Sequence, residues 1–487
     1  MGDDFAALRP CGLTLYADAL MQDQAALGHD VSYLFSGRHY PKLDRPRMKR
    51  WKHGGVRMLE LINSPIHPHW ELGTRYPLRD LEEHAGESAF AAALRSAEPE
   101  VVHIQELSGL PSSLIDMARA AGVPVVMTLH DYKPLCASVR LLDADGQRCL
   151  RRDVGEDCAR NCAGAPDGRS HLVNFTLDFE LARAKRAVPL AQHVDFTRVA
   201  PLVRAAKKRV QREAPAAPIQ QHQQGAPPEH YQRRRDVNVA RLDSCDRLVA
   251  PSRRVAEIYA ALGVDETKLT VQRLTVPHLA ELHPRRGPKP STPLTFVTLG
   301  GCASPSKGSR VVVEAVQRLE RDDYRLVVLG HVEPVAAREL SGVPAVRLAG
   351  SYAPAELDAL LDEGDMGILP STWEEVHGFV GIEMLAKGLP LIASALGGIP
   401  EYVRDGETGW LNRSATGAEL AELMSKALDD PGSVERLRRS VRERRKEIVR
   451  PMREHVAEVN ALYAELASGA ASHEATISSP APRRTSS

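Results

Sequence analysis

The stretch that decides the fold runs from Pro370 to Leu411 and reads PSTWEEVHGFVGIEMLAKGLPLIASALGGIPEYVRDGETGWL. Two of its carboxylates, Glu375 and Glu383, lie eight positions apart with a glycine turn at Gly378 between them. The apolar pattern after that turn predicts a short helix, whose first free N–H groups can face a diphosphate. Glu375 precedes this helix and Glu383 lies about one turn inside it. Both carboxylates could therefore reach sugar or ribose hydroxyls on either side of the phosphates.

The ordered string resembles the glutamate-x7-glutamate region of the retaining glycosyltransferases of family 4. The likeness runs from the Pro-Ser pair at 370–371 through Gly-Gly-Ile-Pro-Glu at 397–401 to Asp-Gly-Glu-Thr-Gly at 405–409. It implies an α/β fold of the GT-B type, with two Rossmann-like domains facing across a cleft and a C-terminal helix that crosses back. The alternative is an ordinary amphipathic helix with solvated carboxylates, which would not need the surrounding glycine turns.

Composition fits a soluble globular protein of more than one domain. The chain has 487 residues, 43% apolar and 26% charged, with a formal net charge of zero. A chain without net charge has no overall electrostatic attraction for nucleic acid. The sequence contains no run of about 18 apolar residues, so no transmembrane segment is predicted. The start, MGDDFAALRP, lacks the regions of a signal peptide, and seven cysteines without one indicate a reducing compartment. We therefore expect a cytoplasmic protein, with a peripheral place at the inner membrane face as the alternative.

Hydrophobic patterning divides the chain into two α/β halves. Expected strands lie at 31–35, 56–63, 101–104, 124–129 and 247–250, and then at 294–299, 325–329, 346–349, 367–369 and 391–393, with expected helices at 13–27, 89–95 and 112–121. Such alternation predicts parallel sheets covered by helices. We expect an N-terminal acceptor-side domain over 1–276, a nucleotide-sugar-binding domain over 277–450, a crossover helix over 451–467 and a disordered tail over 468–487.

Two segments depart from this regular plan. A family 4 domain opens with a strand and a Gly-Gly loop, whereas here Cys11-Gly12 occupies the loop position and the first strand is missing or degenerate within residues 4–9. Residues 207–235 carry basic residues, prolines and a glutamine-rich tract, which predicts a flexible loop or a mobile helix. The basic runs 207–209 and 233–235 are expected on a solvated helix face, with an anionic acceptor or membrane as the alternative.

Candidate ligands outside the glutamate stretch follow strands. Thr-Leu-Gly-Gly at 298–301 ends a strand, and Lys307 opens the next helix, so Gly301 and Lys307 are candidates for the diphosphate. The family commonly has an arginine five residues before this lysine, where this chain has Cys302. His130 closes another strand and matches the family histidine that faces the donor sugar. His103 also ends a strand, and we interpret it as structural.

Four cysteines, Cys136, Cys149, Cys158 and Cys162, fall within one charged excursion of the first domain. Their spacing, C-x12-C-x8-C-x3-C, is compatible with a structural zinc bound by four thiolates. Free thiols and disulfides are the alternatives. Such a zinc would leave no open coordination position, so it would take no part in catalysis.

Together these features predict a hexosyltransferase that moves a sugar from a nucleoside diphosphate sugar to an unidentified glycan, lipid-linked or small-molecule acceptor. The resemblance implies that His130 and Glu375 act on the sugar, that Glu383 binds the ribose, and that Lys307, Gly301 and the N–H groups of Gly378, Phe379 and Val380 bind the diphosphate. It also implies retention of configuration and no required cofactor. The rivals are a non-catalytic GT-B binding or scaffold subunit and a nucleotide-sugar 2-epimerase.

Overall fold

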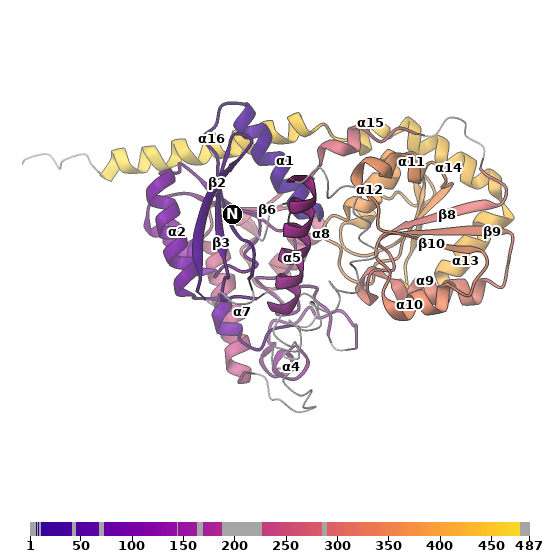
Figure 1. Cartoon of the computed structure of the whole chain (residues 1–487), viewed down its shortest axis with the longest axis horizontal. Coiled ribbons are helices and arrows are strands. Elements are labelled where there is room, and N and C mark those ends of the chain that lie inside the picture. Colours follow the sequence, from indigo (N-terminus) through magenta and orange to yellow (C-terminus); the bar gives the residue numbers. More distant parts are fainter. Residues whose placement is uncertain are drawn as a thin grey trace, which may run out of the picture.

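The computed structural model describes residues 6, 8, 11–40, 45–67, 73–143, 145–162, 169–187, 226–284 and 290–477. These residues form two α/β domains that lie side by side, with the N-terminal domain in indigo to magenta and the C-terminal domain in orange (Figure 1). The last strand of the first domain ends at Val271, and the first strand of the second begins at Leu294. The expected boundary at residue 276 lies between them.

The helices and strands follow one another along the chain as follows. The strands are β1 Ser32–Ser36, β2 Arg47–His53, β3 Val56–Ile62, β4 Val102–Ile104, β5 Val125–Thr128, β6 Arg247–Ala250, β7 Leu269–Val271, β8 Leu294–Leu299, β9 Tyr324–Leu329, β10 Val346–Gly350, β11 Met366–Leu369, β12 Leu391–Ser394 and β13 Gly409–Asn412. The α-helices are α1 Gly12–Ala26, α2 His84–Ala97, α3 Ser113–Ala120, α4 Gly155–Asn161, α5 Arg169–Ala187, α7 Pro228–Ser244, α8 Arg253–Ala261, α9 Ser309–Leu319, α10 Pro334–Leu340, α11 Leu357–Leu361, α12 Phe379–Ala386, α13 Gly417–Asp429, α14 Pro431–Glu443, α15 Arg445–Ile448 and α16 Met452–Ile477.

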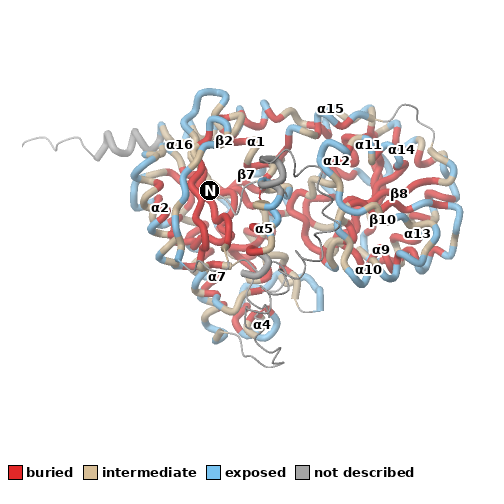
Figure 2. The backbone as a smooth tube through the Cα atoms, viewed as in Figure 1, coloured by how far each residue is buried: buried red, intermediate tan, exposed pale blue. Residues whose placement is uncertain are grey.

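The C-terminal domain is built on one six-stranded parallel sheet in the order β10-β9-β8-β11-β12-β13. Every residue of β8, β11 and β12 is buried, as is typical of central strands covered by helices on both faces (Figure 2). The strand order reverses direction at β8 and β11. The carboxyl ends of these two strands therefore form the switch point at which open α/β sheets bind ligands.

The N-terminal domain has its strands in two sheets. Strands β4, β5, β6 and β7 form a parallel sheet, and β1, β3 and β2 form a second sheet in which only the β2–β3 pair is antiparallel. Within the described residues, β1 and β4 each pair on one side alone. The expected strand at residues 4–9 falls mostly outside the part of the chain that the structure describes.

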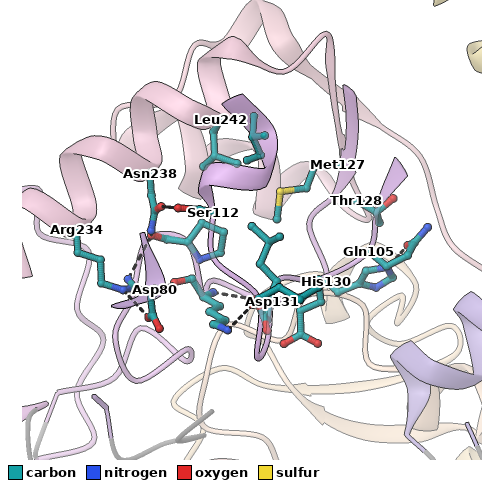
Figure 3. Close-up of a pocket in the computed structure, with 16 residues that line it drawn as sticks. Asp80, Gln105, Ser112, Met127, Thr128, His130, Asp131, Arg234, Asn238 and Leu242 are labelled. Carbon is teal, nitrogen blue, oxygen red and sulfur yellow. Dashed lines mark hydrogen bonds and ion pairs between the residues drawn. The ribbon is translucent and has the colours of Figure 1, made fainter. Parts of the chain in front are cut away.

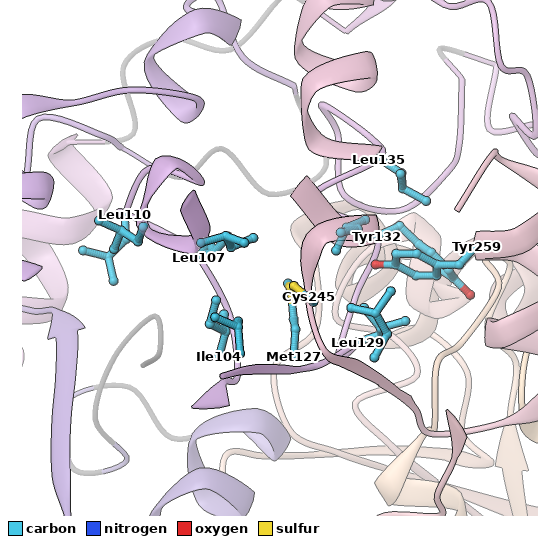
Figure 4. Packing of buried hydrophobic residues seen from close by; sticks show 14 of the residues in the cluster. Ile104, Leu107, Leu110, Met127, Leu129, Tyr132, Leu135, Cys245 and Tyr259 are labelled. Carbon is cyan, nitrogen blue, oxygen red and sulfur yellow. The ribbon is translucent and has the colours of Figure 1, made fainter. Parts of the chain in front are cut away.

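The core of the N-terminal domain gathers around β4, β5 and β6 (Figure 4). It includes Ile104, Met127 and Tyr259, all nearly inaccessible to solvent. Trp373 and Val376, from the glutamate stretch of the other domain, belong to the same cluster, and the rings of Tyr132 and Trp373 meet edge to face with centroids 6.2 Å apart. The loop that carries Glu375 is therefore packed into the neighbouring domain.

A long C-terminal helix ties the domains together. Helix α16 leaves the C-terminal domain and runs across the N-terminal one, where it packs against α1 (Figure 1). Tyr16 of α1 shares a 2.8 Å hydrogen bond with Nε2 of His455. The predicted crossover is confirmed, and the helix continues past the expected end at 467 to Ile477, so the first ten residues of the expected tail are helical.

Most expected strands are present, but some elements differ from the predictions. Strands β2, β7 and β13 were not predicted, because Arg47–His53 is mostly charged and Leu269–Val271 and Gly409–Asn412 are short. Pro228–Ser244 forms α7, with Arg234 and Arg235 each about 3% exposed, whereas the sequence predicted flexibility up to 235 and a solvated basic face. Arg234 instead pairs with Asp80 and donates to the Lys133 carbonyl. The rest of the expected flexible segment, 207–225, lies outside the described residues.

Within the described parts of the chain, none of the helices combines the length and the apolar character needed to cross a bilayer.

Candidate donor site between the domains

Helix α12 begins at the switch point of the C-terminal sheet. Its N-cap, Gly378, has φ +67°, and a Cβ there would lie 2.8 Å from the Tyr402 hydroxyl, so glycine is required on both counts. The free N–H groups of Phe379 and Val380 follow in the first turn. Across the interface, a Cβ on Gly12 would lie 2.9 Å from the Phe379 ring. The first turns of α1 and α12 thus meet between the domains.

Glu375 is buried just before this helix. It is 4% exposed, and its Oε1 accepts hydrogen bonds from Lys307 Nζ at 2.6 Å and Ser371 Oγ at 2.9 Å. Burial acts to raise the pKa of Glu375, but the charge and hydrogen bond of Lys307 outweigh it, and the pKa lies below its ordinary value. Glu375 is therefore an ionised acceptor at neutral pH, suited to hydroxyl donors.

The Gly397-Gly398 loop fixes the backbone of the glutamate segment. Gly398 N–H donates to the Glu375 carbonyl at 2.7 Å, and Gly397 N–H donates to Glu374 Oε2 at 2.8 Å. A Cβ on Gly397 would lie 2.0 Å from that same carbonyl oxygen. The glycines that the sequence singled out are therefore needed for close approach of two backbone segments.

The loop after β8 brings Lys307 to Glu375. Lys307 ends a 3-10 turn, Pro305–Lys307, and Gly308 with φ +95° leads into α9. Gly301 lies in the same loop, where a Cβ would lie 2.2 Å from Thr298 Oγ1. Cys302 is fully buried in the core of the C-terminal domain, so its position does not face the candidate donor site.

Glu383 lies inside α12 and meets a histidine from the segment that joins the domains. His278 Nε2 lies 2.8 Å from Glu383 Oε1, and the side chain of Glu383 is 11% exposed. His278 belongs to a short 3-10 turn, Pro277–Ala280. One oxygen of Glu383 is thus held in place, which orients the carboxylate.

His130 follows β5 on the N-terminal wall. Its Nε2 lies 2.8 Å from Gln105 Oε1 (Figure 3). Its ring centroid lies 5.2 Å from that of Tyr16. Burial, followed by the nearby His377 and His455, lowers the pKa of His130 to about 3. The imidazole is therefore neutral at physiological pH. His377, which contributes to lowering this pKa, belongs to the glutamate stretch of the other domain.

A water-sized hollow of about 20 Å³ adjoins His130 at the carboxyl ends of β4 and β5 (Figure 3). Glu106, Asp131 and Lys133 line it. Burial and then the charge of Glu106 raise the pKa of Asp131 to about 8. Lys133 donates to the Leu107 carbonyl at 2.9 Å. These polar groups lie deeper in the N-terminal domain than the glutamate stretch.

His103 does not face the same space. Its Nε2 shares a 2.8 Å hydrogen bond with Thr128 Oγ1, and its Nδ1 bonds to the hydroxyl of Tyr463 in α16. The structural interpretation of His103 agrees with these contacts, since it joins the strand ends to the crossover helix.

The cysteine excursion gives no support to the zinc prediction. Within the described residues, no group of three or more His, Cys, Asp or Glu side chains is arranged to hold a metal ion. Cys136, Cys149, Cys158 and Cys162 are free thiols, and three of them are buried. A hydrogen bond between Cys158 and Cys162 lowers the pKa of Cys158 to about 7 and raises that of Cys162. None of these four cysteines forms a disulfide.

Sequence reasoning missed three side chains at this site. His278 orients Glu383, Ser371 donates to Glu375, and Trp373 packs beneath Lys307, whose Nζ lies 5.2 Å from the ring centroid. Ser371 and Trp373 lie within the stretch already singled out, so their proximity along the chain was an available signal. His278 lies 105 positions from Glu383, and nothing in the sequence connects the two.

A family model described as "Glycosyl transferases group 1" matches residues 293–430. The D-inositol 3-phosphate glycosyltransferase of Corynebacterium aurimucosum is 34% identical over 137 residues, which cover 26% of this chain and 32% of that protein. The glycogen synthase of Mycobacterium tuberculosis is 38% identical over 108 residues, covering 22% and 26%. The chain therefore spans about a third or less of the length of these relatives.

Solved structures resemble the chain over nearly its whole length. Sucrose-phosphate synthase from Thermosynechococcus elongatus has a TM-score of 0.61 at 17% identity and covers 96% of both chains. Anabaena HepE, in a complex with UDP and glucose, has a TM-score of 0.55 at 14% identity and covers 94% of this chain and 96% of its own. This chain has the GT-B fold. The predicted architecture is confirmed, while the finer placement in family 4 stays a prediction because the family match is to group 1 as a whole.

Proposed function

We propose that the protein is a glycosyltransferase that moves a sugar from a nucleoside diphosphate sugar to a hydroxyl-bearing acceptor with retention of configuration. The observation that carries the proposal is the Lys307–Glu375 ion pair, held at the sheet switch point beside the first turn of α12. A cation, free N–H groups and an ionised carboxylate meet there, which matches the diphosphate and the sugar of such a donor. The group 1 match over residues 293–430 and the UDP complex of the structural neighbour support this choice of donor.

Each residue has a chemical task in this proposal. Lys307, with the N–H groups of Phe379 and Val380, stabilises the charge that develops on the leaving diphosphate. Glu383, oriented by His278, accepts hydrogen bonds from the ribose hydroxyls. Gly301 and Gly378 allow the backbone to approach the phosphates closely.

The reacting sugar would lie between the two walls of the interface. Glu375 accepts from its hydroxyls on one side, and His130 contacts it from the other. His130 is neutral, so it acts through hydrogen bonding and not as a cation. The leaving phosphate can take the acceptor proton, so catalysis rests on positioning and on charge stabilisation.

The test is an assay of nucleotide release from UDP-, GDP-, ADP- and dTDP-sugars, with and without a panel of hydroxyl acceptors. A glycosyltransferase transfers the sugar and releases nucleotide in step with acceptor. Release without acceptor, together with an epimerised sugar, would identify the 2-epimerase. Binding of a nucleoside diphosphate, seen as a raised melting temperature, with no turnover across the panel would identify a binding or scaffold subunit.

A further inference from the structure

The positive charge of Lys307 is not enough to compensate a diphosphate at the proposed donor site. Lys307 bonds to Glu375, so part of its charge is already compensated before any donor binds. A diphosphate carries a negative charge on each phosphate, and bringing it into a partly buried site requires matching positive charge. Cys302, in the same loop, is fully buried among apolar side chains and cannot supply it. Another part of the molecule can supply the compensating group.

Arg140, from the N-terminal domain, reaches this loop. It lies between β5 and α4, yet its Nη1 donates a 2.7 Å hydrogen bond to Oγ of Ser306, the neighbour of Lys307. Its Cζ lies 4.8 Å from the centroid of the Trp373 ring, and Lys307 Nζ lies 5.2 Å from the same ring. The two cations therefore share one aromatic side chain, which holds both beside Glu375.

The charge of Arg140 also acts on Glu375. Burial raises the pKa of Glu375, and the groups that bring it down include the charge of Arg140 in addition to Lys307. A charge acts on a buried carboxylate in this way only at short range. Arg140 therefore belongs to the same electrostatic site as Glu375 and Lys307, although it is separated from them by more than 160 positions in the chain.

The backbone around Arg140 is strained on both sides. Val139 has φ +72° and Leu141 has φ +52°. Left-handed backbone is rare for side chains of this kind, above all for a β-branched residue such as Val139, and such strain is concentrated at functional sites. Hydrogen bonds hold it in place, since Val139 O accepts from Tyr132 N–H at 3.3 Å and Leu141 O accepts from Cys149 N–H at 2.8 Å. From this strained segment, Arg140 reaches Ser306 of the second domain.

We infer that Arg140 is a second diphosphate-binding cation of the donor site, contributed by the opposite domain. The inference rests on the proposed function. A guanidinium can bind phosphate oxygens through two parallel N–H bonds, so Arg140 can contact the diphosphate from the side opposite α12. The donor would then be bound by both domains at once. Binding of the diphosphate would stabilise the contact between them, because Arg140 and Lys307 are carried by different domains.

The test compares nucleotide affinities of single variants by isothermal titration calorimetry. UDP, GDP, ADP and dTDP are titrated into the wild-type protein, and the tightest binder and its phosphate-free nucleoside are carried forward. Arg140→Ala should lower the affinity for the nucleoside diphosphate about 10- to 100-fold, because hydrogen bonds to charged groups are lost. It should leave the affinity for the nucleoside unchanged. Arg140→Lys should recover part of the loss, since it restores the charge but not the two parallel bonds.

Two controls separate phosphate binding from a structural role. Arg160→Ala removes an arginine of the same excursion whose side chain is 72% exposed, and it should leave affinity unchanged. Ser306→Ala removes one hydrogen-bond partner of Arg140 but keeps the guanidinium, and it should change diphosphate affinity by less than about 3-fold. A loss for Ser306→Ala as large as that for Arg140→Ala would overturn the inference, because Arg140 would then act only as a contact between domains.

Two further outcomes would also overturn it, and they are distinguishable. If the wild-type protein binds a nucleoside diphosphate and folded Arg140→Ala and Arg140→Lys bind it equally well, Arg140 is not a phosphate ligand and the proposed function stands. If the wild-type protein binds none of the four, the proposed function fails and this inference fails with it. Circular dichroism and melting temperature establish that each variant is folded before it is titrated.

Discussion

Lys307 Nζ lies 2.6 Å from Oε1 of Glu375, and the side chain of Glu375 is only 5% exposed. The cation proposed for the diphosphate and the carboxylate proposed for the sugar are thus joined in one ion pair. This pair lies between a loop after β8 and a loop before α12, so it also links the two sides of the sheet switch point. Removing either partner leaves the charge of the other without its counter-charge in a partly buried site.

Lys307→Ala should destabilise the protein most at neutral pH. Without the ammonium group, burial dominates, and the pKa of Glu375 should rise above its ordinary value. The stability that Glu375 gains from the pair is present above pH 4.5, the ordinary value, and is lost as pH falls through the lowered folded-state pKa. Urea unfolding should therefore give a lower free energy of unfolding for the variant than for the wild type at pH 7. This difference should become smaller under acidic conditions.

The double variant Lys307→Ala/Glu375→Gln is the matched control for that experiment. It removes both charges, so it should be more stable at pH 7 than Lys307→Ala alone. A gap that does not change with pH, or a double variant as unstable as the single one, would show that packing of the lysine stem and not the ion pair explains the effect.

Glu383→Ala should weaken nucleoside diphosphate binding about 10- to 150-fold, the value expected when charged hydrogen bonds to ribose are lost. His278→Ala should cause a smaller loss, because it frees the orientation of Glu383 without removing the carboxylate. Titration with a ribonucleotide and its 2′,3′-dideoxy analogue is the check. Both variants should discriminate less between the two ligands than the wild type does, and undiminished discrimination in folded Glu383→Ala would contradict the ribose assignment.

The sequence predicted the parts of this site that are continuous in the chain. Glu375, Gly378 and Glu383 lie within one string, and the glycine turns between them leave few alternative conformations. Strands such as β8 and β12 were equally clear, because they are buried on both faces and read as apolar runs.

What the sequence could not predict depends on long-range pairing. His278 meets Glu383, and Arg140 meets Ser306, across 105 and 166 positions. No periodicity or motif carries that information. The Arg140–Ser306 contact arises only when the two domains pack together, and the His278–Glu383 contact only when the segment that joins the domains folds against α12. Arg234 and Arg235 were misinterpreted for a related reason. A run of arginines resembles a solvated face until the acidic and carbonyl partners that bury it, such as Asp80, are brought near by the fold.

His130→Ala should lower turnover strongly while the affinity for free nucleoside diphosphate stays nearly constant. His130 lies on the wall opposite α12, so it would contact the sugar and not the nucleotide. An interaction felt mainly in the transition state reduces kcat and kcat/KM together. Because its pKa is about 3, protonation of His130 should add no limb near pH 6.5 to the pH–rate profile. Full activity in the variant, or a limb near 6.5 that His130→Ala abolishes, would contradict this assignment.

Gly397→Ala should damage both stability and donor binding, and Gly406→Ala is its matched control. Both glycines have positive φ, +59° and +78°, so each substitution should cost roughly 1 kcal/mol for left-handed backbone.

The two glycines differ in their surroundings. A Cβ on Gly397 would lie 2.0 Å from the Glu375 carbonyl oxygen, whereas one on Gly406 would meet no described residue within 4 Å beyond its two chain neighbours. Gly397→Ala must therefore displace the segment that carries Glu375, and it should lower the melting temperature further than Gly406→Ala and weaken nucleoside diphosphate binding, which Gly406→Ala should leave intact. Equal melting temperatures and equal affinities for the two variants would show that the close approach of the Gly397 loop does not position Glu375.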